Sequence, residues 1–171
     1  MIRAILVAVL AAAPAFASSE HHDHTAPPKD FERLAKLLGH WEAALDGGKT
    51  AHVWIKLIAG GTTLLETEKI GDEPEMITVF HPDGKDVVLT HYCSANNQPH
   101  MKLVKADDKE LHFDFVSATN LSSPDASHMS NVTFSFIDED HYNENWTWTE
   151  KGKKESALFK FERKKPEAAK P

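Results

Sequence analysis

The chain has very little cysteine, since Cys93 is the only one among its 171 residues. A single thiol cannot form an internal disulfide, so stability must come from a hydrophobic core, which one domain of this length can supply. Long apolar runs are also lacking. The N-terminal run, Ile5 to Ala13, is shorter than the roughly 20 residues that a helix needs to cross a bilayer. These absences argue against a disulfide scaffold and against stable membrane insertion.

Common catalytic and metal-binding motifs are missing as well. The folded part contains no Gly-x-Ser-x-Gly, no glycine-rich phosphate loop, and no His-Glu-x-x-His or Cys-x-x-Cys spacing. The formal net charge is −7, and the only basic run is Arg163-Lys164-Lys165. Nucleic acids and anionic membranes both reward clustered Lys and Arg, so neither is expected as the main partner. The sequence favours a binding protein over an enzyme.

The N-terminal segment, residues 1–17, is typical of a secretory signal peptide. It has a basic residue, an apolar stretch and a small-x-small cleavage site, namely Arg3, Ile5–Ala13 and Ala15–Ala17. Residues 18–29 are polar and histidine-rich and predict a flexible tail, and residues 166–171 predict a second tail. We therefore expect an exported protein, periplasmic or secreted, with a single domain at residues 30–165.

The domain begins with a helical pattern and continues with strands. Asp30 is a candidate helix cap, followed by apolar residues at helical spacing: Phe31, Leu34, Leu37 and Leu38. After Trp41 the apolar period changes to two, and nine turn signals recur about every 8 to 12 residues. The pattern predicts an all-β fold, a single antiparallel up-and-down β-barrel of about ten strands with a short N-terminal capping helix.

The two ends of the strand region predict how the barrel closes. Phe159, Phe161 and Arg163 share one face of the last strand. An arginine on an apolar face needs a partner, and the indole of Trp41 on the first strand can supply one by stacking. First and last strands are neighbours in a closed barrel, so this pair is expected to be structural.

A short helix, the segment Gly39-His40-Trp41, about ten meandering strands and a terminal inward arginine resemble the calycin superfamily, which includes the lipocalins and fatty-acid-binding proteins. The resemblance covers residues 31–165 and implies a barrel with a ligand cavity open at one end. Nitrobindin-like haem-binding barrels are similar in strand count, but none of their local motifs is found here. Their haem ligand is therefore not transferred to this chain.

The candidate site residues are mostly polar or aromatic groups expected on the inner face of the barrel or in the loops near its mouth. On the fifth strand, His91 and Cys93 share a face with apolar residues. Glu144 shares a face with Trp146 on the ninth strand, and Glu66 lies beside Leu64 on the third. An inward carboxylate cannot stay charged and unpaired in an apolar interior. The complete expected ligand-binding set is Glu66, His91, Cys93, Gln98, Met101, Phe115, Asn120, His128, Glu144 and Trp146.

The sequence leaves three possible functions for these ligand-binding residues. The leading hypothesis is non-catalytic binding of a small, largely apolar or amphipathic molecule. The second is haem or transition-metal binding through His91, His100 or His128 together with Cys93, with weak chelation by the tail histidines of residues 21–24. The third is an enzyme that pairs His91 with Glu66 or Glu144. Each residue also has a structural interpretation, such as a hydrogen-bonded core histidine or a solvent-facing glutamate. The oligomeric state is not predicted.

Overall fold

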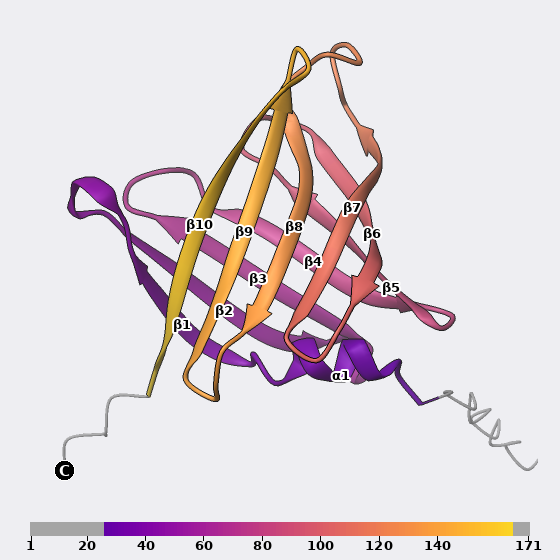
Figure 1. The fold of residues 1–171 in the computed structure, drawn as a ribbon, viewed down its shortest axis with the longest axis vertical. Coiled ribbons are helices and arrows are strands. Elements are labelled where there is room, and N and C mark those ends of the chain that lie inside the picture. Colours follow the sequence, from indigo (N-terminus) through magenta and orange to yellow (C-terminus); the bar gives the residue numbers. More distant parts are fainter. Residues whose placement is uncertain (1–25, 166–171) are drawn as a thin grey trace, which may run out of the picture.

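The computed structural model describes residues 26–165, which form a closed antiparallel barrel with one short helix against it (Figure 1). Each strand pairs with its neighbour in sequence, and β1 pairs with β10 to close the barrel. The elements are α1 (Lys29–Ala35), β1 (Gly39–Ala44), η1 (Asp46–Gly48), β2 (Thr50–Ile58), η2 (Ala59–Gly61), β3 (Thr63–Ile70), β4 (Met76–Asp83), β5 (Asp86–Tyr92), β6 (Gln98–Ala106), β7 (Glu110–Thr119), β8 (His128–Phe136), β9 (His141–Glu150) and β10 (Lys153–Lys164).

The predicted fold class is confirmed, including the ten strands and the short helix. No helix within residues 26–165 is long and apolar enough to span a membrane. The expected signal peptide, most of the histidine-rich tail and the C-terminal tail lie outside the described residues.

The expected cap of the helix is wrong. The N-cap of α1 is Pro28, and its carbonyl accepts the backbone N–H groups of Phe31 and Glu32. Asp30 lies inside the first turn, where its carboxylate is 3.2 Å from Nη1 of Arg33. Proline's restricted φ, −55° here, suits a helix start, so the preceding proline takes the position that the sequence pattern gave to the aspartate.

The lower part of the barrel is apolar, and α1 covers it (Figure 1). We call this the helix end and the opposite end, which holds the β3–β4, β5–β6 and β7–β8 connections, the loop end. Inward side chains of alternating strand positions fill the helix end together with Phe31, Leu34 and Leu37: Trp41, Val53, Leu64, Phe80, Leu89, Phe113, Phe134, Tyr142 and Phe161.

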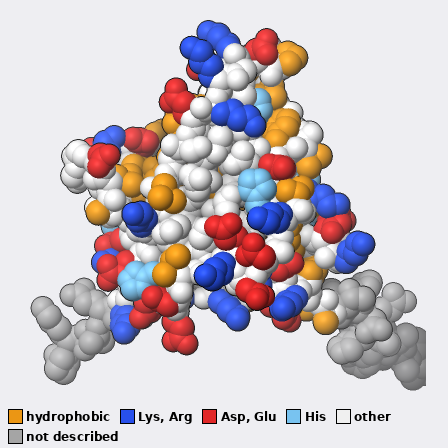
Figure 2. All heavy atoms as spheres, in the orientation of Figure 1, with side chains coloured by type: hydrophobic (Ala, Val, Ile, Leu, Met, Phe, Trp, Pro, Cys, Tyr) orange, Lys and Arg blue, Asp and Glu red, His pale blue; other side chains and the backbone are white. Residues whose placement is uncertain are grey.

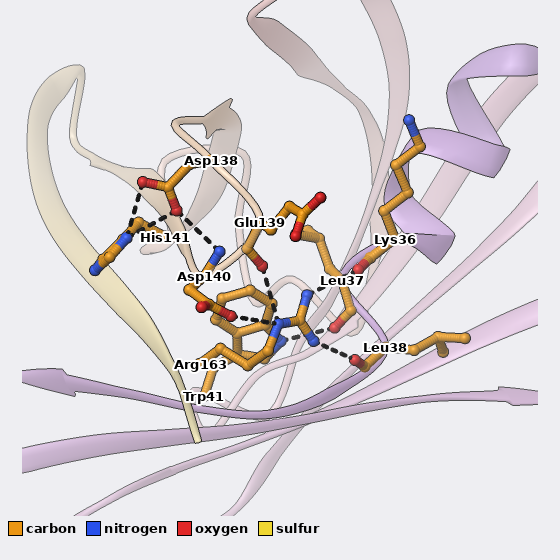
Figure 3. Close-up of polar contacts among 9 residues, drawn as sticks. All are labelled: Lys36, Leu37, Leu38, Trp41, Asp138, Glu139, Asp140, His141 and Arg163. Carbon is orange, nitrogen blue, oxygen red and sulfur yellow. Dashed lines mark hydrogen bonds and ion pairs between the residues drawn. The ribbon is translucent and has the colours of Figure 1, made fainter. Parts of the chain in front are cut away.

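Arg163 closes the helix end as the strand pattern predicts. Its guanidinium carbon lies 4.0 Å from the centroid of the Trp41 ring. Its Nη1 and Nη2 donate to the carbonyls of Leu38 and Lys36 at 2.7 and 3.0 Å, which ties β10 to the segment after α1 (Figure 3). Gly39 permits this close approach, because a Cβ there would lie 3.3 Å from Nη1 of the arginine and its φ is +125°.

Candidate functional site

A row of polar side chains crosses the inner wall of the barrel above the apolar helix end. Glu66 on β3 pairs with Thr78 on β4, and Thr78 pairs with His91 on β5. All three are buried, at 2% exposure each. Side chains at directly paired positions point to the same face of a sheet, so the register places the three groups side by side.

Residues of β9 face this row from the opposite wall. Glu144 is buried and accepts two hydrogen bonds, from the Tyr142 hydroxyl at 2.9 Å and from the Trp146 indole Nε1 at 2.8 Å. The Trp146 ring is 4.8 Å from the His91 ring between centroids. The two walls thus meet in one buried polar cluster, made of Glu66, Glu68, Thr78, His91, Tyr142, Glu144 and Trp146.

The carboxyl groups of Glu66 and Glu144 are both buried. Burial raises the pKa of both groups, and the charge of Glu144 raises the pKa of Glu66 further. Donation from Tyr142 and Trp146 stabilises the charged form of Glu144 and opposes the effect of burial on its pKa. Of the two groups, Glu66 is therefore the one that keeps its proton to higher pH.

Glu68 extends the cluster by one inward position toward the loop end. Burial, together with the charge of Glu144, raises the pKa of Glu68 to about 8. The side chain is buried, and its Oε1 has no hydrogen-bond partner among the described residues. Glu68 is therefore a protonated carboxylic acid at neutral pH.

The His91 ring is neutral, and within residues 26–165 only one of its two nitrogens has a hydrogen-bond partner. Burial lowers the pKa of His91 to about 4. Its Nδ1 and the Thr78 hydroxyl share a hydrogen bond of 3.0 Å, whereas Nε2 has no partner within the described part of the chain. Among residues 26–165, no hydrogen bond joins His91 to a carboxylate, because Thr78 lies between it and Glu66. The contact required by the enzyme hypothesis is therefore not made here.

Two further predicted residues, Met101 and Phe115, lie near the cluster. A third, His128, lies beside Phe115 toward the loop end. Met101 on β6 is fully buried. Phe115 on β7 is half-buried, and its ring lies 4.7 Å from the ring of His128 on β8 between centroids. His128 is fixed by a hydrogen bond between Nδ1 and the Ala126 carbonyl. Met101 thus belongs to the apolar core beside Leu89, whereas Phe115 and His128 are half-buried and contact each other.

Three predicted residues lie away from the cluster, and for Cys93 the expected inward position is wrong. Cys93 does not lie on the inner face of β5, because that strand ends at Tyr92 and Cys93 begins the turn that follows. Gln98 is on the outer face of β6, where it accepts a hydrogen bond from Thr119. Asn120 is exposed in the β7–β8 loop with a φ of +61°. None of the three contributes to the buried cluster.

The expected convergence of histidines is also not observed. His100 is on the outer face, hydrogen-bonded to Thr90, while His91 is inside and His128 is held at the loop end. A different group in the described residues could hold a metal ion: His40 and Glu42 on β1 with His52 on β2. The alternation His40-x-Glu42 places two of these on one strand face, but only the register with β2 brings the third beside them.

The sequence analysis missed Glu68 and Thr78. Glu68 could have been found by continuing the alternation of Leu64 and Glu66 along β3, which puts a second glutamate on the inner wall. Thr78 gave no signal of its own, because only strand pairing places it between Glu66 and His91.

A groove of about 830 Å³ lies outside the barrel between α1 and the β8–β9 hairpin. Asp138 in its lining pairs with His141 at 2.8 Å (Figure 3). Basic and acidic side chains are interspersed over the face drawn in Figure 2, without an extended patch of one sign. We place the candidate functional site in the interior, because three side chains of the described residues there, Glu66, Glu68 and His91, each have a buried polar atom without a hydrogen-bond partner.

The fold and the interior cluster define a class, a closed ten-strand antiparallel barrel with a polar layer in its core. No family model matches the chain, and no match is found among the curated proteins. The solved structures include a similar one, described as the crystal structure of Rv2717c from M. tuberculosis, with 14% identity and a TM-score of 0.50. The match covers 82% of this chain and 100% of that one. This likeness supports the barrel fold, while the calycin assignment stays a prediction.

Proposed function

We propose that this protein is a non-catalytic binding protein whose barrel interior holds a small amphipathic molecule with a cationic or hydrogen-bond-donating head group. One observation carries the proposal: among residues 26–165, Glu66 Oε2, Glu68 Oε1 and His91 Nε2 are buried without hydrogen-bond partners. An unsatisfied buried polar atom costs roughly 1 to 3 kcal/mol. A ligand whose head group forms hydrogen bonds with these three atoms removes that cost.

The charge and surroundings of the cluster select the ligand chemistry. The cluster contains three buried carboxyl groups, those of Glu66, Glu68 and Glu144, so an ammonium group is favoured over a carboxylate. Trp146 and Phe115 supply apolar surface next to the polar groups. The haem alternative gains no support here, since His91 is in contact with Thr78 and Trp146 on the crowded inner wall.

Three short probes that differ only in head group test the proposal. We expect hexylamine to bind the full chain more tightly than hexanol, and hexanoate not to bind, as measured by isothermal titration calorimetry at pH 7. Glu66→Leu combined with Glu68→Leu is expected to weaken hexylamine binding by about tenfold or more, because each charge-assisted hydrogen bond contributes about 1.5 to 3 kcal/mol. His81→Ala changes an exposed histidine and serves as the control.

Equal binding of hexanoate and hexylamine, or unchanged hexylamine binding in the folded double variant, would contradict the proposed head group. Native mass spectrometry of protein purified without denaturant gives an independent readout. A retained mass that carries an amine, present in the parent and lost in the double variant, supports the proposal.

We also propose that the protein is exported after cleavage of residues 1–17. The support is the sequence pattern of Arg3, the apolar stretch and Ala15–Ala17. Expression of the full chain in an exporting bacterial host is expected to yield a product that begins at Ser18, as measured by intact mass. A product that keeps Met1 and stays in the cytoplasmic fraction argues against export.

A further inference from the structure

The outer face of β1 and β2 carries a compact group of potential ligands that the proposed interior site does not use. His40 and Glu42 lie two residues apart on β1, so their side chains leave the same face of the strand. His52 on β2 pairs directly with Glu42. We call this group the β1–β2 tripod. It is independent of the barrel interior, because these side chains point away from it.

Two of the three separations between the ligand atoms match those around a tetrahedral metal ion. His40 Nε2 and His52 Nδ1 share a hydrogen bond of 3.3 Å, His52 Nδ1 and Glu42 Oε1 are 3.3 Å apart, and His40 Nε2 and Glu42 Oε1 are 3.9 Å apart. Bonds of about 2.0 to 2.1 Å to Zn²⁺ in tetrahedral geometry give ligand–ligand separations of about 3.3 to 3.4 Å. Two edges of the tripod match this value, and the third is longer by about half an ångström.

Neighbouring side chains hold the tripod in position. Trp54, on β2, stacks on the His40 ring at 4.8 Å and on the His52 ring at 5.7 Å between centroids, with interplanar angles of 6° and 11°. Lys164 contacts the other carboxylate oxygen, Glu42 Oε2, at 3.1 Å, which leaves Oε1 directed at the two imidazoles. Orienting contacts of this kind, made to the ligands from outside, are typical of metal sites.

Each ligand side chain is about one-third exposed, at 30%, 29% and 34% for His40, Glu42 and His52, so a metal ion can enter from solvent.

We propose that the β1–β2 tripod binds a divalent transition-metal ion through His40 Nε2, Glu42 Oε1 and His52 Nδ1. Imidazole ligands favour Zn²⁺ and its neighbours in the transition series over Mg²⁺ and Ca²⁺, which prefer oxygen. Three protein ligands leave a fourth position, directed to solvent, for water or an added ligand.

Titration of the full chain with Zn²⁺ alone tests the site. The other candidate chelators are His21, His22 and His24, so the parent for this experiment carries alanine at these three positions. We expect calorimetry to show binding of one Zn²⁺ per chain at pH 7.5 and no heat with Mg²⁺. His40→Ala and His52→Ala are each expected to weaken binding by more than about tenfold, since even outer-shell substitutions cost 10- to 100-fold. His81→Ala is the control.

Thermal unfolding provides a second readout that does not depend on the heat of binding. Excess Zn²⁺ is expected to raise the Tm of the parent and of the control, because a ligand that binds the folded state stabilises it, and to leave both tripod variants unchanged. The site is overturned if Zn²⁺ does not bind the parent, or if His40→Ala and His52→Ala, folded by circular dichroism, bind Zn²⁺ as the control does.

Discussion

Replacing Glu68 with glutamine is expected to stabilise the protein at pH 8 and to leave its stability unchanged at pH 4.5. Glutamine mimics the protonated carboxylic acid in shape and in polarity. The pKa of Glu68 in the fold is about 8, against an ordinary value of 4.5. A difference of this size corresponds to a gain on the order of 4 kcal/mol at pH 8, at about 1.4 kcal/mol per pKa unit.

The sign follows from proton binding. Between pH 4.5 and about 8 the folded protein keeps a proton on Glu68 that the unfolded chain has lost. The contribution of Glu68 to stability is therefore complete below pH 4.5 and is lost as the pH rises through 8. His91 acts in the opposite direction: burial lowers the pKa of His91 to about 4, so its contribution is present above 6.5 and is lost as the pH falls through 4.

Urea unfolding at several pH values measures this difference. The gap between Glu68→Gln and the parent should widen from pH 4.5 to pH 8, whereas the His91 effect is common to both and cancels. Glu155→Gln on β10 is the control, because Glu155 is exposed. A gap that is constant with pH, or equal to that of the control, would mean that Glu68 titrates normally and is not a buried acid.

The sequence predicts the barrel well because its signals are local. Turn residues and alternation identify ten strands, and the inward arginine on the last strand predicts the contact between Arg163 and Trp41 that the structure shows. The same alternation places Glu66 and Glu144 on the inner wall. The strands and their inner faces depend on residues close together in the chain, and the contact between Arg163 and Trp41 needs only one further assumption, that the first and last strands pair to close the barrel.

The candidate site is only partly predictable, since it depends on register. Thr78 separates His91 from Glu66 because three strands pair at these positions. The β1–β2 tripod likewise requires the pairing of Glu42 with His52. Cys93 was misplaced for a different reason: its parity matches that of His91, but β5 ends one residue before it. Alternation gives the face of a strand residue and says little about where the strand stops.

Arg163→Met is expected to destabilise the protein by on the order of 4 kcal/mol, because a guanidinium in this position makes several charge-assisted hydrogen bonds, each contributing about 1.5 to 3 kcal/mol without full additivity. Nη2 and Nη1 of Arg163 donate to the carbonyls of Lys36 and Leu38, and Nε donates to the Glu139 carbonyl at 3.0 Å. Methionine keeps much of the apolar stem and removes all three donors.

Arg163→Lys is expected to recover only part of this loss. An ammonium group cannot match the planar fork that reaches three carbonyls from two separate segments while it lies flat on Trp41. Arg33→Met is the matched control: Arg33 also lies over an aromatic ring, at 4.8 Å from the centroid of Phe136, but its ion pair with Asp30 is local. That change should cost about 1 kcal/mol or less.

Denaturant unfolding of the three variants at pH 7 measures these differences. The expected order of stability is Arg33→Met, then Arg163→Lys, then Arg163→Met. If Arg163→Met is as stable as Arg33→Met, the contact between β10 and the segment after α1 does not hold the helix end together. In that case the apolar packing of Phe31 and Leu34 under the barrel suffices to keep α1 in place, and the inward arginine has no structural role.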